Sequence, residues 1–328
     1  MVPRAVYSGR YPAAIGFPSV DDMIQVDQLT KSYGGKTVVD NVTFRVEPGS
    51  VTGFLGPNGA GKTTTMRMLL GLERPDSGRA LIGGKPYAEH RAPIREVGVL
   101  LDARAAHPNR SARNHLRIIA RTHGISNRRV DEVIGLAGLD SVANKRAGSF
   151  SLGMGQRLGI AVALLGDPRA LILDEPVNGL DPEGVSWIRT LTRSLAAEGR
   201  AVLISSHLMA EMAQTADRVI VLGRGAILAD ESMSDVVSGA GRVRTRTTSA
   251  VELAALLRRD GAEVLQLDAS TLEITGLTAE AIAETARTGG ILLIELATVQ
   301  VSLEDAFFEL THGSVEFRQT TTTSEDPR

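Results

Sequence analysis

Eight consecutive residues of this chain have the composition and spacing of a phosphate-binding loop. They follow the apolar run 51–55, precede a helical pattern, and read Gly56-Pro57-Asn58-Gly59-Ala60-Gly61-Lys62-Thr63. Strand, glycine-rich turn and helix are the context that this pattern requires. Glycines let the backbone curl so that several N–H groups point at one anion, and the helix N-terminus adds its positive dipole end. The loop therefore predicts binding of a nucleoside triphosphate.

Within the loop, two side chains have separate tasks. Lys62 places a cation against the β- and γ-phosphates, and Thr63 offers a hydroxyl to Mg²⁺. We expect the nucleotide to contact Gly56, Pro57, Asn58, Gly59, Ala60, Gly61, Lys62, Thr63 and Thr64.

Two carboxylates, Asp174 and Glu175, follow a second apolar strand pattern at 170–173. Alone, such a pair is usually a solvated turn, but downstream of a phosphate-binding loop the functional interpretation is favoured. We expect Asp174 to support Mg²⁺ from its outer shell, and Glu175 to polarise a water for attack on the γ-phosphate. His207 follows another buried-strand pattern and could orient the same water, although a lone histidine there is most often structural.

The composition is that of a mixed α/β protein of about two domains. The 328 residues are 43% hydrophobic and carry a net charge of −2, which gives no electrostatic footprint for nucleic acid. Without cysteine, disulfides and thiolate chemistry are excluded. No apolar run approaches the roughly 20 residues that cross a bilayer, and the N-terminus lacks the apolar core of a signal peptide. We therefore expect a cytoplasmic protein without a nucleic-acid partner.

Apolar strand patterns alternate with helical ones through most of the chain, which indicates a largely parallel sheet. We assign residues 1–22 to an irregular extension and 23–237 to a nucleotide-binding domain with a helical insertion near 111–147. Beyond a small-residue linker, residues 242–312 predict the βαββαβ order of a ferredoxin-like fold, closed by a helix at 302–311. Residues 313–328 predict a disordered tail.

A further motif lies between the loop and Asp174, at Phe150-Ser151-Leu152-Gly153-Met154-Gly155-Gln156-Arg157. With the other motifs it resembles the ATPase subunit of an ABC transporter, from about Met23 to Leu228. The resemblance implies that Ser151, Gly153 and Met154 form a signature that closes over ATP held by the opposite subunit. It also implies that Tyr33 stacks on adenine and that Asp181 belongs to a loop crossing the dimer interface. For His207 it implies a catalytic role, in which the side chain orients the attacking water.

Two motifs depart from the usual pattern of that family. Leu152 and Met154 replace a glycine and the glutamine of the signature, a variant that resembles the drug- and antibiotic-resistance exporters. Asp102 stands where a glutamine normally contacts Mg²⁺, and the resemblance implies that its carboxylate reaches the ion.

The resemblance thus implies an ATPase that uses ATP and Mg²⁺ and acts as a homodimer. It would sit at the cytoplasmic face of the membrane and power a separately encoded permease that exports a drug-like or lipophilic compound. An ABC-type ATPase of DNA maintenance or translation is the alternative. An ATPase of DNA maintenance would need a long insertion between Lys62 and Ser151, where this chain has room only for a compact helical subdomain. A translation factor of this kind usually has two cassettes in one chain, whereas this chain has one phosphate-binding loop. A regulatory module that binds ATP without turnover is disfavoured by Glu175 and His207.

Overall fold

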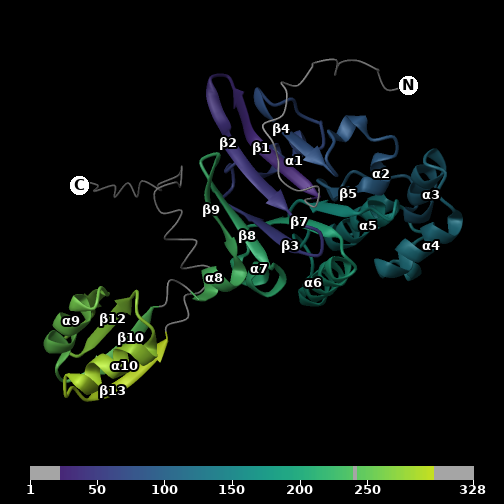
Figure 1. Ribbon diagram of the computed structural model, residues 1–328. Coiled ribbons are helices and arrows are strands. Elements are labelled where there is room, and N and C mark those ends of the chain that lie inside the picture. The colour runs from purple at the N-terminus through teal and green to yellow at the C-terminus, as the bar shows by residue number, and fades with distance from the viewer. Residues whose placement is uncertain (1–22, 239–241, 299–328) are drawn as a thin grey trace, which may run out of the picture. The chain divides into compact units, whose positions relative to one another are not determined.

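A computed structural model describes residues 23–238 and 242–298 of the chain (Figure 1). These residues form two compact units. The first contains residues 23–208 and 214–230, and the second contains residues 209–213, 231–238 and 242–298. Throughout the described residues, every helix is too short or too polar to cross a membrane.

The first unit is built on two sheets. One is antiparallel, in the order β2-β1-β4, and the other has the order β5-β6-β7-β3-β8-β9 with parallel pairing from β5 through β8. The strands are β1 (Ile24–Tyr33), β2 (Lys36–Val46), β3 (Val51–Leu55), β4 (Ser77–Ile82), β5 (Val97–Leu100), β6 (Ala170–Leu173), β7 (Ala201–Ser206), β8 (Arg218–Gly223) and β9 (Ala226–Ser232).

Glycine-containing turns join the hairpins of these sheets. Gly34 and Gly35 connect β1 to β2, and Arg224 and Gly225 connect β8 to β9, all with positive φ. Two consecutive residues with positive φ match the right-handed twist of the flanking strands, so both links form tight hairpins.

The main hydrophobic core joins residues of both sheets with the helix that follows β3. Strands β3, β6 and β7 are buried at every position, because helices and the antiparallel sheet cover them. Phe44 of β2 and Phe54 of β3 meet with ring centroids 5.2 Å apart, and Met66 and Leu69 of α1 are enclosed in the same core.

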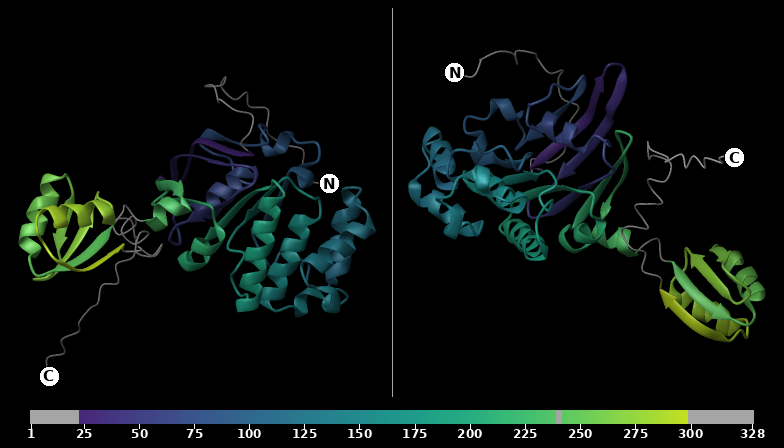
Figure 2. Two further views of the ribbon diagram at one scale, coloured as in Figure 1. Left: turned by 60° about the horizontal axis from the view of Figure 1, so that its bottom comes forward. Right: turned by 180° about the vertical axis from the view of Figure 1, so that it is seen from behind.

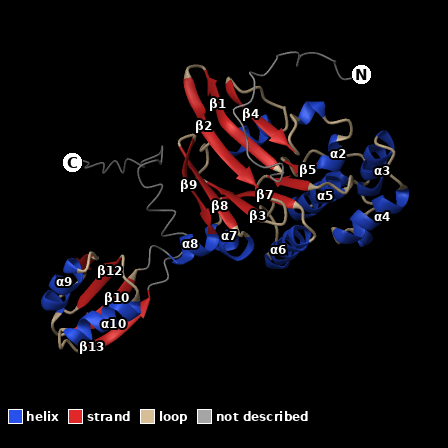
Figure 3. Cartoon of the chain, viewed as in Figure 1, coloured by secondary structure: helices blue, strands red, loops and turns tan. Residues whose placement is uncertain are grey.

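Helices cover the parallel sheet and form a separate helical segment (Figure 3). Helix α5 contacts β5, α6 contacts β7 and β3, and α3, α4 and α5 contact one another. The α-helices of this unit are α1 (Lys62–Leu69), α2 (Pro93–Glu96), α3 (Ala112–Thr122), α4 (Asn127–Leu136), α5 (Leu152–Leu164) and α6 (Pro182–Ala197). Most residues of α7 (Met209–Thr215) and all residues of α8 (Met233–Ser238) belong to the second unit. Short 3₁₀ turns occupy Tyr87–Glu89, Asp140–Val142 and Ala147–Ser149.

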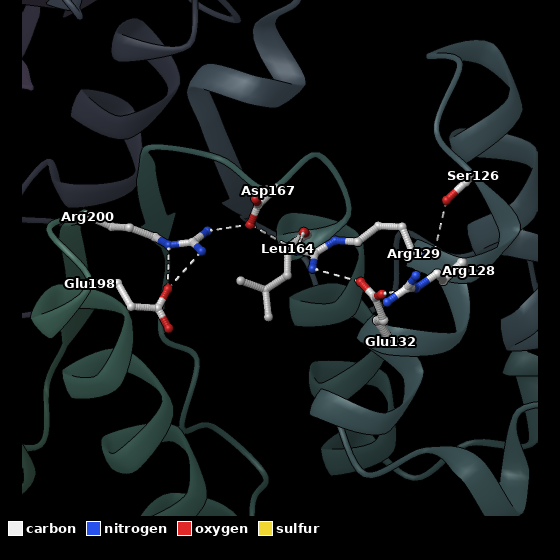
Figure 4. Close-up of polar contacts among 8 residues, drawn as sticks. All are labelled: Ser126, Arg128, Arg129, Glu132, Leu164, Asp167, Glu198 and Arg200. Atoms are coloured by element: carbon white, nitrogen blue, oxygen red, sulfur yellow. Dashed lines mark hydrogen bonds and ion pairs between the residues drawn. The ribbon is translucent and has the colours of Figure 1, made fainter.

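A polar network ties the helical segment to the turns that lead into β6 and β7 (Figure 4). Arg129 of α4 donates to the carbonyl of Leu164 at 2.7 Å and pairs with Asp167 at 3.2 Å. Arg200 pairs with the same carboxylate at 3.0 Å and with Glu198 at 2.9 Å. The Asp167 carboxylate thus lies between two guanidinium groups from different parts of the unit.

The second unit contains a four-stranded antiparallel sheet with two helices on one face (Figure 2). Its elements are β10 (Val243–Thr247), α9 (Ala250–Arg259), β11 (Glu263–Gln266), β12 (Thr271–Thr275), α10 (Ala279–Thr288) and β13 (Leu293–Thr298). The βαββαβ order and the strand order β11-β12-β10-β13 confirm the predicted ferredoxin-like fold. The predicted helix at 302–311, the extension 1–22 and the tail 313–328 lie outside the described residues.

Candidate nucleotide site

The phosphate-binding loop lies where the sequence pattern predicts it, between the end of β3 and the start of α1. A Cβ atom on Gly56 would lie 2.7 Å from the carbonyl oxygen of Leu222, and one on Gly61 would lie 2.7 Å from that of Val38. Gly61 also has φ 104° and forms the N-cap of α1. Both positions therefore require glycine, because neighbouring backbone fills the space of any side chain.

Lys62 is folded into the interior of this loop and is only 6% exposed. Its ammonium donates to the carbonyl oxygens of Gly56 at 2.6 Å and Pro57 at 3.3 Å. Burial lowers the pKa of Lys62 below 10.5, and the nearby charges of Glu175 and Asp174 partly oppose this shift. A cation that has lost contact with water at the centre of the loop is suited to binding an anion. A phosphate would supply the favourable interaction with the charge that water no longer provides.

Asp174 connects the phosphate-binding loop to the sheet. Its Oδ2 accepts a hydrogen bond from the Thr63 hydroxyl at 2.7 Å, and its Oδ1 accepts one from the Ser205 hydroxyl at 2.5 Å. The same Ser205 oxygen accepts the N–H of Glu175 at 2.8 Å. Ser205 is fully buried at the end of β7, so its direct contacts align the ends of β6 and β7.

Glu175 has an unusual backbone conformation for a side chain of its size, with φ 49°. Non-glycine residues in this region are strained and are concentrated at functional sites. One carboxylate oxygen lies 2.7 Å from His207 Nδ1, and the other lies 3.9 Å from Lys62 Nζ. The carboxylate is thus held beside the cation of the phosphate-binding loop, in a position suited to polarise a water.

Gln156 links the helix of the signature motif to the carboxylate loop. Its side-chain amide donates to the backbone oxygens of Glu175 at 3.2 Å and Asn178 at 3.3 Å, and the residue is 5% exposed. The sequence motifs predicted no role for Gln156 or Ser205. A polar residue within the apolar run of α5, and one at the end of a fully apolar strand, were the signals that could have identified them.

The signature residues lie at the N-terminus of α5. The Ser151 hydroxyl caps the helix by accepting the N–H of Met154 at 3.2 Å, and Leu152 beside it is 42% exposed. A Cβ on Gly153 would lie 2.9 Å from the carbonyl oxygen of Gly179, so this position also requires a very small residue. Among the described residues, Ser151 shares no hydrogen bond with the site residues of β6, β7 or the phosphate-binding loop.

Asp181 caps α6, since its Oδ1 accepts the N–H of Gly184 at 2.9 Å. This contact supplies a structural role for the residue beside the interface role that the resemblance implies.

Three further predicted residues lie at separate places. Tyr33 ends β1, is 46% exposed, and has the ammonium of Lys31 5.2 Å from its ring centroid. Asp102 accepts the N–H of Arg104 at 2.8 Å in a local turn, a contact within its own loop. Thr64 is half-buried in the first turn of α1. The predicted roles of all three in binding nucleotide or metal stay predictions.

Comparison with known protein families gives two matches along the chain. A model described as ABC transporter matches residues 39–178, and a domain of unknown function (DUF8746) matches residues 241–304. The first match contains the phosphate-binding loop, the signature and the Asp174–Glu175 pair.

Two related sequences illustrate the relationship. The uncharacterised ABC transporter ATP-binding protein YhcH of Bacillus subtilis is 34% identical over 305 residues, which cover 90% of this chain and 97% of that protein. The bacitracin transport ATP-binding protein BcrA of Bacillus licheniformis is 45% identical over 209 residues, covering 63% of this chain and 68% of BcrA.

Among solved structures, cbiO1 from Clostridium perfringens, part of an ABC transporter complex, is 27% identical with a TM-score of 0.59. The superposition covers 74% of this chain and 98% of that one. The predicted fold class is therefore confirmed, as a P-loop α/β core with a helical insertion followed by a small α+β unit. YhcH matches along nearly its whole length, and the geometry of the motifs agrees with that match. This chain therefore belongs to the ATP-binding proteins of ABC transporters and is the ATP-hydrolysing subunit of such a transporter.

Proposed function

We propose that Glu175 and His207 act together on the water that attacks the γ-phosphate of ATP bound at the loop. The observation that carries this proposal is the continuous chain of contacts from Thr63 through Asp174 and Ser205 to Glu175, and from there to His207. Lys62 and the loop amides bind the phosphates, while the strained backbone of Glu175 aims its carboxylate at the same place. Chemistry then needs only positioning and charge, as in other phosphoryl transfers.

Mg²⁺ is the metal that these residues fit. The Thr63 hydroxyl and Asp174 carboxylate lie together and offer hard oxygen ligands. In the described part of the chain, no group of three or more histidine, aspartate or glutamate side chains could enclose a metal. This suits an ion held by one or two protein oxygens together with water and substrate phosphates. Bound there, Mg²⁺ would neutralise charge on the β- and γ-phosphates.

The active form in this proposal is a homodimer, with ATP between the loop of one subunit and the signature of the other. The exposed N-terminus of α5 supports it, because Leu152 and Ser151 are open to solvent in a single chain. A helix N-terminus offers N–H groups and a positive dipole end to a phosphate. The arrangement is isologous, since each subunit would give and receive the same contact.

The transporter in this proposal consists of the ATPase dimer and a separately encoded permease, with the ATPase at the cytoplasmic face of the membrane. We propose that it exports a drug-like or lipophilic compound. Support comes from relatives named for bacitracin transport and for lantibiotic transport, such as SrtF of Streptococcus pyogenes, which is 35% identical over 209 residues.

Disulfide crosslinking tests the dimer directly, because the chain has no native cysteine. Asn58 is the better partner for Ser151 than the adjacent Gly59, since Gly59 has φ 82° and would be strained by any side chain. With Ser151→Cys and Asn58→Cys on a Glu175→Gln background, ATP should drive a bond between chains. Bonds that form only within one chain, or form equally without ATP, would rule out the sandwich dimer.

Export is tested in cells that contain the chain and its permease. Expression of both should raise resistance to the exported compound, and Glu175→Gln should abolish the gain. An equal gain from the Glu175→Gln protein would show that resistance does not depend on ATP hydrolysis.

A further inference from the structure

An open cavity of about 540 Å³ lies on the helical segment, beside α3. Four arginines line it, and the other lining residues are three asparagines, Ser111 and Ile118. The arginines are Arg110, Arg117, Arg121 and Arg146. They come from α3 and from the segments before and after the helical pair, so the fold gathers them from separate places in the sequence.

The positive charge of this cavity is not neutralised within the described residues. No aspartate or glutamate lines the cavity, and none of its four arginines forms an ion pair with another described residue. Nearby arginines of the same segment do form such pairs, since Arg113 pairs with Asp131, and Arg129 pairs with Glu132. The carboxylates of Asp131 and Glu132 therefore pair with arginines outside the cavity, and the four arginines of the cavity remain together without an opposite charge from the described residues.

One nitrogen of the Arg117 side chain is also buried without a partner. The Nε of Arg117 is inaccessible to solvent and finds no hydrogen-bond acceptor within the described structure. A buried N–H donor without an acceptor is unfavourable, because it has lost its hydrogen bonds to water and gained none in return. The pKa of the neighbouring His115 is lowered, first by burial and then by the positive charge of Arg110. Both observations indicate a site that is suited to an anion.

We propose that this cavity binds a phosphate-bearing anion with two or more negative charges, either a free diphosphate or the headgroup of an acidic phospholipid. Guanidinium groups present rigid pairs of N–H donors that match phosphate oxygens. The asparagine amides can complete the set of donors, and the volume falls within the range of small-ligand pockets. None of these residues belongs to the nucleotide site, so the proposal stands apart from the proposed hydrolysis.

The test uses the full chain with Lys62→Met, which removes the cation of the phosphate-binding loop and leaves the cavity intact. Binding of inorganic pyrophosphate is measured by calorimetry, and binding to vesicles is measured by flotation. The vesicles contain phosphatidylcholine alone or phosphatidylcholine with phosphatidic acid. Adding Arg117→Ala and Arg146→Ala should weaken binding of the anion by at least about tenfold, as expected when two charge-assisted contacts are lost.

Arg91→Ala is the matched control, because Arg91 is an exposed arginine outside the cavity. It should leave binding unchanged. Pyrophosphate binding alone would identify a free anion as the ligand, and binding only to vesicles with phosphatidic acid would identify a lipid headgroup.

The proposal is overturned if neither probe binds, if the double variant binds as tightly as its parent, or if Arg91→Ala is equally weakened. It is also overturned if an acidic peptide binds where both phosphate probes fail. Unchanged thermal unfolding of the double variant would show that a loss of binding does not reflect a loss of fold.

Discussion

The Ser205 hydroxyl donates to Asp174 Oδ1 at 2.5 Å, and its oxygen accepts the N–H of the next residue, Glu175. One buried side chain on β7 therefore holds both carboxylate residues that follow β6. Because Asp174 also contacts Thr63, a displacement of Ser205 would reach the phosphate-binding loop through a single intermediate residue.

Ser205→Ala should slow turnover by about tenfold, on the order of 1–3 kcal/mol for a lost buried hydrogen-bond partner, while ATP affinity changes little. The reason is that Glu175 loses the contact that fixes its strained backbone. Steady-state hydrolysis and nucleotide titration measure the two effects separately. Thr52→Val on the adjacent strand β3 is the control, since the buried Thr52 hydroxyl has no partner in the described structure. Equal losses in both variants would mean that Ser205 acts only through packing.

Glu175→Gln should retain ATP affinity and lose most turnover, because phosphate binding depends on the loop and the attack by water depends on the carboxylate. The variant should also accumulate as a dimer when ATP is present. Size-exclusion chromatography with and without ATP measures this. Hydrolysis at the unchanged rate would remove Glu175 from the catalytic role.

Lys62→Met should abolish ATP binding, as measured by titration with a fluorescent ATP analogue. It should also change how stability depends on pH. Because burial lowers the pKa of Lys62 in the folded state, the unfolded state binds more protons between that pKa and 10.5. The free energy of unfolding therefore rises with pH across this window through Lys62, and the variant should lack that rise. Parallel slopes for both proteins would contradict the shift.

Gln156→Met should lower turnover more than ATP affinity. The substitution keeps the length of the side chain but removes the donor to the carbonyl oxygens of Glu175 and Asn178. Leaving those oxygens without this donor should also lower the free energy of unfolding by about 1–3 kcal/mol. Arg157→Met, on the next residue of α5, is the control because Arg157 contacts Ala137 and the ring of Trp187 instead. Turnover that falls only in proportion to stability would leave Gln156 with a structural role alone.

The elements of the core could be predicted because their patterns are local. Strands β3 and β6 occupy the predicted residues, since continuous apolar runs bounded by glycine and charged residues leave little freedom in where each strand ends. The hairpin strand β9 was not predicted, because only Ala229 is buried among its seven residues and the others give no alternating pattern.

Within the candidate site, too, the residues of local motifs could be predicted and those that act through distant contacts could not. Lys62, Thr63, Asp174 and Glu175 belong to contiguous motifs, which predicted them. Ser205 acts through a hydrogen bond that joins residues 31 positions apart, and no spacing rule along a chain encodes such a contact.

The burial of Lys62 changes what an arriving nucleotide must do. The ammonium has already left water and is held by the carbonyl oxygens of Gly56 and Pro57. In the proposed binding mode, a phosphate would replace those partners rather than strip a hydration shell from the lysine. Binding in this mode would be an exchange of ligands around a cation that the protein already holds in place.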